Sequence, residues 1–130
     1  MLLDERIKSA ETHQFRIIFN DTLNDNGSLF GGSAMLWMDE VAYITAIRFS
    51  RMKVVTVYIE KVKFKKAILP GSLVELIGKV IKVGRVKIEI QVEIYVETTG
   101  SDKREKAVES TFLFAAIDAN KKPICFENYK

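Results

Sequence analysis

The stretch GSAMLWMDEVAYITAIRFS, residues 32–50, decides the fold that this chain favours. It contains no proline, it is rich in good helix formers, and Ser33 stands near its start, so we predict a helix over Gly32 to about Ser50. Apolar side chains lie around almost the whole circumference of this helix, which indicates burial on several sides. We therefore expect one long, central helix.

Five further segments have the pattern of β-strands, because they run apolar or alternate at strand spacing. They are His13–Phe19 before the helix and Lys53–Lys65, Leu73–Val83, Val86–Glu97 and Ala107–Asp118 after it. The connections between the later strands are short, which favours antiparallel pairing. One helix then covers one face of one sheet, so we predict a single α+β domain over residues 1–130 in which a sheet wraps a helix.

Length, composition and charge exclude several classes of protein. The chain has 130 residues, of which 48% are apolar and 28% charged, a balance that argues against a disordered chain. Asp39, Glu40 and Arg48 interrupt the longest apolar stretch, which argues against a membrane span. The opening residues lack the pattern of a secretory signal, and Cys125 is the only cysteine, so we expect a cytoplasmic protein without disulfides. The net charge of +3 favours an anionic ligand without identifying one.

Asp39 is the residue of the helix that most needs an explanation. Its neighbours include Trp37, Met38 and Val41, so its carboxylate must reach a partner, a cleft or a subunit boundary to avoid a large desolvation cost. The alternative is structural: Asp39 or Glu40 marks a narrow solvated stripe, or pairs with a lysine. Of the two carboxylates, we expect Glu40 to be the solvated one.

The glycine pair Gly31 and Gly32 opens the same helix. Free backbone N–H groups at a helix start carry partial positive charge, and glycine lets a ligand approach the backbone closely. These two residues are therefore candidates for an oxyanion hole. The alternative is a tight turn that feeds a closely packed helix, since glycine pairs are common in turns.

Helix geometry separates the two candidate groups. Gly32 and Asp39 are seven residues apart, which places them on about one face but roughly 10 Å apart along the helix axis. A reacting carbonyl lies about 3 Å from its oxyanion donors and from its attacking group, so the two groups must come within roughly 6 Å of each other. If both are catalytic, the glycines of one chain meet Asp39 of another, as two antiparallel helices across a two-fold axis allow. We predict active sites at a dimer interface.

An ordered set of motifs resembles the acyl-CoA hydrolase branch of the hot-dog family, specifically the bacterial broad-specificity acyl-CoA thioesterases. The motifs cover roughly four fifths of the domain. They are NDNGSLFGG at 24–32, MDEVA at 38–42, KVVTVYIEKVKF at 53–64, PGSLVELIGKVIKVGR at 70–85 and STFLFAAID at 110–118. The resemblance implies a hot-dog fold, with a long helix wrapped by a curved antiparallel sheet, and hydrolysis of an acyl-CoA thioester.

The resemblance also implies roles for individual residues. Asp39 matches the catalytic acid, which acts as a general base on water or as a nucleophile. Gly31 or Gly32 matches the amide that polarises the thioester carbonyl. Asn24 matches an amide residue that faces the site and positions the water or the carboxylate, although an ordinary turn asparagine is an equal alternative.

Further residues match the region that binds coenzyme A, which is part of the substrate and product, so that no separate cofactor is expected. Gly84 and Arg85 match the family's turn near the nucleotide. The hydroxyl residues common after this Gly-Arg pair in relatives are replaced by Val86 and Lys87, a departure that puts the nucleotide contacts in doubt. Three alternating lysines, Lys61, Lys63 and Lys65, are candidates for facing phosphate groups, against the alternative of a solvated row.

Other functions fit the sequence less well. His13, the only histidine, lies outside the helix motif, which disfavours the hot-dog dehydratases, and we expect it to be structural. The chain has no G-x-S-x-G elbow, no set of metal ligands and no nucleic-acid signature. A non-catalytic acyl-CoA sensor on the same fold is the main alternative, but it does not need a buried Asp39. We expect a homodimer as the minimal active unit, with a trimer of dimers as the second possibility.

Overall fold

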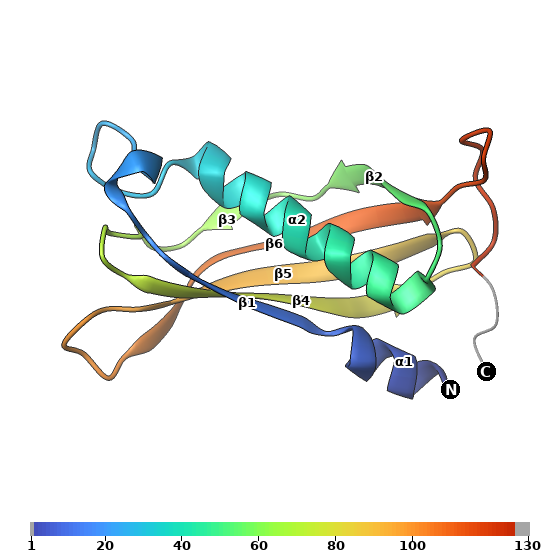
Figure 1. Cartoon of the computed structure of the whole chain (residues 1–130), viewed down its shortest axis with the longest axis horizontal. Coiled ribbons are helices and arrows are strands. Elements are labelled where there is room, and N and C mark those ends of the chain that lie inside the picture. Colours follow the sequence, from blue (N-terminus) through green and yellow to red (C-terminus); the bar gives the residue numbers. More distant parts are fainter. Residues whose placement is uncertain (1, 127–130) are drawn as a thin grey trace.

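The computed structural model describes residues 2–126, which form two α-helices and a six-stranded antiparallel sheet (Figure 1). The elements in chain order are α1 (Leu3–Ala10), β1 (Thr12–Ile17), a 3-10 turn η1 (Asn20–Thr22), α2 (Gly31–Ser50), β2 (Val54–Ile59), β3 (Lys63–Phe64), β4 (Leu73–Val83), β5 (Lys87–Glu97) and β6 (Arg104–Ala116). The strand order is β1-β4-β5-β6-β2, and β3 pairs with β6 at a different part of that strand from β2. The predicted α+β architecture is confirmed.

Helix α2 lies along one face of the sheet and forms the core with it (Figure 1). Every second residue of β5 is buried towards the helix, which is the period-2 pattern of a strand covered on one face. The helix approaches β4 closely at Gly78, where an added Cβ would lie 2.4 Å from Thr45 Oγ1. Glycine at this position therefore sets the distance between helix and sheet.

Two of the predicted strands differ from the structure in their extent. The segment predicted as one strand over residues 53–65 is divided into β2 and β3, because its pairing with β6 shifts at a bulge between Thr56 and Tyr58 and is interrupted before Lys63. Strand β6 begins at Arg104 rather than Ala107, because its ladder with β5 extends to the pair Glu97 and Arg104. An alternating pattern reveals neither the interruption nor the extension.

Helix α1 was not predicted. Its first turn contains two acidic residues and its last turn contains Lys8, which suits the helix dipole. Arg6 fixes it to the end of α2 through a hydrogen bond of 2.6 Å from its guanidinium to the carbonyl of Phe49. Near the other end of the chain, Phe126 is buried and its N–H donates to the carbonyl of Arg85.

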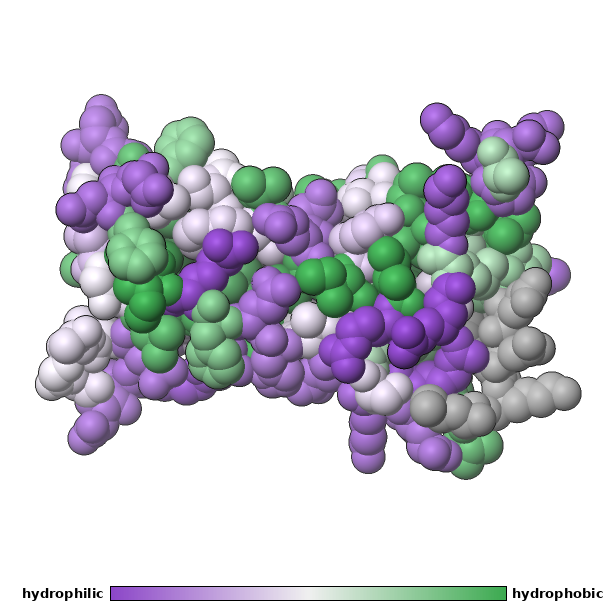
Figure 2. Space-filling view, in the orientation of Figure 1, coloured by the Kyte–Doolittle hydropathy of each residue, from purple (hydrophilic) through white to green (hydrophobic). Residues whose placement is uncertain are grey.

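The prediction that α2 is buried on several sides is wrong for the single chain. Leu36 is 59% exposed and Tyr43 43% exposed, so one apolar stripe of the helix faces outwards. A second group of exposed apolar side chains lies where β1 ends and α2 begins, and Figure 2 shows apolar surface at this end of the molecule, on the left. Its members are Phe15, Ile17, Phe19 and Phe30.

Candidate active site

Asp39 lies in the middle of α2 and is half-buried. Its Oδ1 atom accepts a hydrogen bond of 3.2 Å from the hydroxyl of Thr56 on β2. Within residues 2–126 it forms no ion pair, so the alternative of a lysine partner is wrong for the described chain. Glu40 is exposed, as expected. The structure thus holds one oxygen of the Asp39 carboxylate and leaves the other without a described partner.

The surface around Asp39 is apolar and open. Leu36 and Tyr43 flank Asp39 on α2, and β2 is an edge strand of the sheet. Four residues of β2, namely Val55, Val57, Tyr58 and Ile59, are also exposed. We call these six residues the β2 face. The register of β2 places Ile59, like Thr56, on the side of the sheet that faces α2, and it places Val55 and Tyr58 on the other side. An open strand edge with exposed apolar residues has the properties of an interface.

The start of α2 presents free backbone donors. Phe30 is the N-cap residue and provides no side-chain cap, and the N–H groups of Gly31 and Gly32 donate to no acceptor within residues 2–126. An added Cβ at Gly32 would lie 2.6 Å from the exposed ring of Phe30, which would have to move. An added Cβ at Gly31 would lie 3.6 Å from the ring of Phe64, which is ordinary contact.

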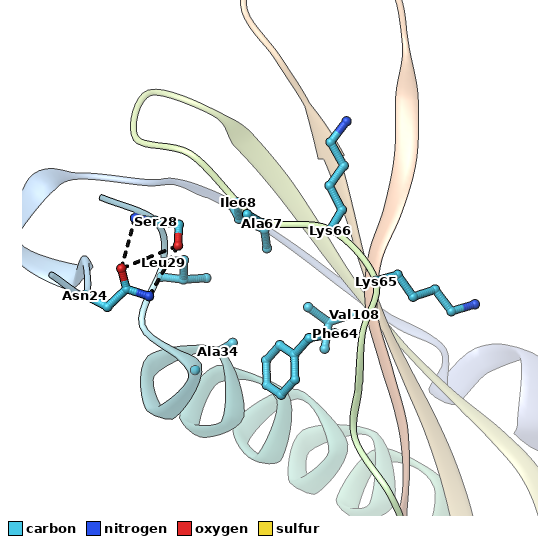
Figure 3. Close-up of a pocket in the computed structure, with 11 residues that line it drawn as sticks. Asn24, Ser28, Leu29, Ala34, Phe64, Lys65, Lys66, Ala67, Ile68 and Val108 are labelled. Atoms are coloured by element: carbon cyan, nitrogen blue, oxygen red, sulfur yellow. Dashed lines mark hydrogen bonds between the residues drawn. The ribbon is translucent and has the colours of Figure 1, made fainter. Parts of the chain in front are cut away.

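A cavity of about 390 Å³ opens beside this helix start (Figure 3). Its lining residues are Asn24, Ser28, Leu29, Gly31, Ala34, Phe64, Lys65, Lys66, Ala67, Ile68 and Val108. The structure therefore brings Asn24, Gly31 and Lys65 together around one cavity, but Asp39 does not line it. Within one chain, the helix start and the Asp39 carboxylate are separate, as the helix geometry predicts.

Asn24 has its side chain engaged in its own turn. Its Oδ1 accepts hydrogen bonds from the backbone N–H groups of Asn26, at 2.9 Å, and Ser28, at 3.2 Å. Its Nδ2 donates to the Ser28 hydroxyl at 3.2 Å. Asn24 thus orders the loop that precedes α2, the role of a turn asparagine, at the rim of the cavity.

The residues predicted to bind coenzyme A lie in two separate regions. Gly84 and Arg85 form the turn between β4 and β5, beside a cavity of about 400 Å³ at the opposite end of the sheet from the start of α2 (Figure 1). Lys61 and Lys63 line a cavity of about 220 Å³ together with Glu109, with which Lys65 forms an ion pair at 3.1 Å. Hydrogen bonds from Lys106 and from Lys65 hold the pKa of Glu109 below its usual range. A single chain does not bring these five residues together.

Thr56 is the site residue that sequence reasoning missed. It stands in an alternating strand pattern in which threonine is an ordinary strand residue. Its contact with Asp39 depends on the register of β2 against β6 and on the position of α2 over the sheet. No sequence signal available from one chain identifies it.

Residues 26–102, more than half of the chain, match the Thioesterase superfamily. The chain belongs to the thioesterase superfamily. Its fold is the hot-dog fold of that superfamily, as the resemblance implied.

Relatives of this thioesterase-superfamily chain include an uncharacterised acyl-CoA thioester hydrolase of Haemophilus influenzae, 38% identical over 100 residues. That match covers 75% of this chain and 65% of the relative. Among solved structures, an acyl-CoA hydrolase from Staphylococcus aureus in complex with butyryl coenzyme A and coenzyme A superposes with a TM-score of 0.86 at 28% identity, covering 92% of this chain and 73% of that one. A hexameric broad-specificity acyl-coenzyme A thioesterase superposes with a TM-score of 0.82 at 31% identity, covering 88% and 85%.

Variants of the Staphylococcus aureus enzyme have also been solved, in which one aspartate, one asparagine or one threonine is replaced by alanine. In that enzyme the asparagine precedes the aspartate by fifteen positions, and the threonine follows the aspartate by 17. Asn24, Asp39 and Thr56 have the same two separations in this thioesterase-superfamily chain. Their order and spacing therefore agree at all three positions.

Two further observations concern membrane-spanning helices and metal sites. None of the helices within residues 2–126 is long and apolar enough to cross a membrane. In the same part of the chain, no group of three or more His, Cys, Asp or Glu side chains is placed to hold a metal ion.

Proposed function

We propose that this protein hydrolyses acyl-CoA thioesters to a free acid and coenzyme A, with Asp39 as the catalytic carboxylate. The observation that supports this most is the state of Asp39, which is half-buried, has no ion-pair partner in the described chain and is held by Thr56 beside an open apolar surface. The matching separations of Asn24, Asp39 and Thr56 in the Staphylococcus aureus enzyme support the same assignment.

Asp39 can act in two ways. As a general base, it takes a proton from water while the water oxygen adds to the thioester carbon, after which the C–S bond breaks and the coenzyme A sulfur leaves with the electron pair and is protonated. As a nucleophile, its carboxylate displaces the sulfur to give a mixed anhydride, which water then hydrolyses. In both cases, the hydrogen bond from Thr56 fixes one carboxylate oxygen and leaves the other to react.

The amide N–H of Gly31 or Gly32 polarises the thioester carbonyl. Negative charge develops on the carbonyl oxygen as the nucleophile adds, and a helix N-terminus stabilises it through its free N–H groups and its dipole. The packing of Phe30 and Phe64 against these glycines keeps larger side chains away from the helix start.

The complete site needs two chains. Asp39 lies beside the edge strand β2, whereas Gly31 lines a cavity that Asp39 does not line. Pairing of the β2 face with its copy on a second chain covers the exposed apolar residues and places Asp39 opposite the helix start of the partner. We propose this homodimer as the minimal active unit, and a trimer of dimers as the larger assembly, by analogy with the hexameric relative.

Coenzyme A then spans residues that one chain keeps apart. We propose that Gly84 and Arg85 bind the nucleotide, with Lys61, Lys63 and Lys65 near phosphate groups, and that contributions come from more than one chain. No other cofactor is proposed. The lone Cys125 and an acyl-CoA substrate fit a cytoplasmic location.

The test is thiol release from a panel of acyl-CoAs by the purified protein and by two variants. Asp39→Asn removes the base and is expected to lower kcat by about 10²–10⁴-fold. Glu40→Gln, one residue along and exposed, is the matched control and is expected to retain activity. Binding of acyl-CoA by the unchanged protein without turnover would instead favour a non-catalytic sensor, and a folded Asp39→Asn variant with near-normal rates would refute the role of Asp39.

A further inference from the structure

The cavity at the start of α2 has an apolar interior and a polar rim that is already paired. Lys65 and Lys66 point away from it, towards Glu109 and Glu105 with which they form ion pairs (Figure 3). Asn24 and Ser28 bond to each other. The remaining side chains of the lining are apolar. No charged group is left to face a ligand inside, so the interior suits an alkyl chain.

Phe64 occupies an unusual place in this cavity. It belongs to the two-residue strand β3 and pairs with Val108, which also lines the cavity. Its side chain is 56% exposed, although it is one of the largest apolar groups of the chain. Its ring points towards the first turn of α2, where an added Cβ on Gly31 would lie 3.6 Å from it (Figure 3). The tip of the ring therefore lies beside Gly31, which also lines the cavity.

We propose that this cavity holds the acyl chain of the substrate and that Phe64 is the residue that determines which acyl chains it accepts. The inference rests on the proposed function. The acyl chain is attached to the carbonyl carbon, so a carbonyl polarised at the start of α2 places the first carbons of the chain beside that helix end. Gly31 is a member of the cavity lining, so a chain that leaves the carbonyl enters the cavity beside the Phe64 ring.

The size of the cavity sets the class of substrate. A volume of about 390 Å³ lies near the lower end of the range for small-molecule pockets, about 300–1,000 Å³. The cavity therefore fits short- and medium-chain acyl groups, and the Phe64 ring closes the path that a longer chain needs. Removal of the ring lengthens the space without disturbing the buried core, because the side chain is largely exposed.

The experiment measures kcat/KM for acyl-CoAs from C4 to C16 with the unchanged protein, Phe64→Ala, Phe64→Leu and the control Phe19→Ala. Phe19 is another exposed phenylalanine, and it does not line this cavity. We expect Phe64→Ala to raise the ratio of kcat/KM for C16 over C4 by at least about tenfold, with Phe64→Leu intermediate. Inhibition by free coenzyme A is expected to stay unchanged in the Phe64 variants. The control Phe19→Ala is expected to keep both the kcat/KM values and the inhibition of the unchanged protein.

Two outcomes would overturn the inference. An equal effect of Phe64→Ala on every chain length would show that the ring does not contact the acyl chain. Weaker inhibition by free coenzyme A would show that the pantetheine arm occupies the cavity instead. Both outcomes leave the proposed function intact as long as the unchanged protein hydrolyses acyl-CoA and Asp39→Asn does not. Absence of turnover by the unchanged protein would refute the proposed function itself.

Discussion

At the scale of single residues, the contact between Asp39 and Thr56 turns a helix aspartate into a positioned carboxylate. An unpaired carboxylate among apolar neighbours has a desolvation cost, which the Thr56 hydroxyl offsets in part by donating to Oδ1. The sequence predicts that Asp39 is an unusual charged residue in an apolar helix. This prediction is possible because it needs only the neighbours of Asp39 along the chain. It does not predict Thr56, whose role depends on tertiary register.

Replacement of Thr56 tests this positioning role. Thr56→Val keeps the shape of the side chain and removes the donor, and we expect kcat to fall by about tenfold or more, since hydrogen bonds to charged groups contribute about 1.5–3 kcal/mol. Thr56→Ser retains the hydroxyl and is expected to recover most of the activity. If thiol release is lost in Thr56→Ser and retained in Thr56→Val, the methyl group rather than the hydrogen bond matters.

His13 gives the stability of the fold a dependence on pH. Its ring contacts Glu75 at 2.7 Å and Glu11 at 2.6 Å, and these carboxylates raise the pKa of the imidazole in the folded protein, with Arg104 also bound to Glu75. A raised folded pKa means that this stabilisation is fully present below the unfolded value near 6.5 and is lost as pH rises through the folded value.

We therefore expect the unfolding free energy of the unchanged protein to exceed that of His13→Gln at pH 5.5 and to approach it at pH 9. The difference is small, because the site is partly exposed and screened by solvent. Denaturant titrations of both proteins across this pH range provide the measurement. A difference that is constant with pH would contradict the account.

At the scale of elements, the first turn of α2 combines several conditions that favour binding of an anion. Its first amides have no acceptor within the described chain, Phe30 approaches position 32, and the cavity opens at Gly31. Sequence reasoning identified this element and its glycines, because helix propensity and glycine pairs are local signals. It missed α1 and the division between β2 and β3, whose existence depends on contacts with the end of α2 and with β6.

Proline substitution can remove the amides of this turn one at a time. Phe30 has φ −63° and ψ 131°, a conformation that suits a residue before proline, and proline is well tolerated at the first position of a helix. We expect proline at position 31 or at position 32, whichever supplies the donor, to lower kcat by about 10²–10³-fold.

Gly31→Ala is the matched control for this experiment. It adds a Cβ at ordinary contact distance from Phe64 and keeps the N–H, so near-normal activity is expected. If neither proline variant loses activity while both remain folded by circular dichroism, the helix start does not bind the carbonyl.

At the scale of the whole molecule, the exposed stripe of α2 and the open edge of β2 meet where Asp39 contacts Thr56. The pattern along α2 predicted burial all round, and the single chain leaves Leu36 and Tyr43 exposed. The sequence pattern shows that a residue is apolar, but it does not show whether its own chain or another chain covers it. In the proposed homodimer, the interface covers these residues and also contains Asp39, so assembly and catalysis depend on the same contacts.

Subunit mixing tests this central claim most directly. The Asp39→Asn protein is mixed with the protein that carries the inactive proline substitution at the start of α2, so that the two exchange subunits, and thiol release is measured. If each site takes its carboxylate from one chain and its amide from the other, half of the sites in every mixed dimer are intact, so an equal mixture regains about one quarter of the unchanged activity. A chain carrying both substitutions, mixed with either single variant, should regain none. A mixture that forms mixed dimers by native mass spectrometry and yet stays inactive would contradict the shared site.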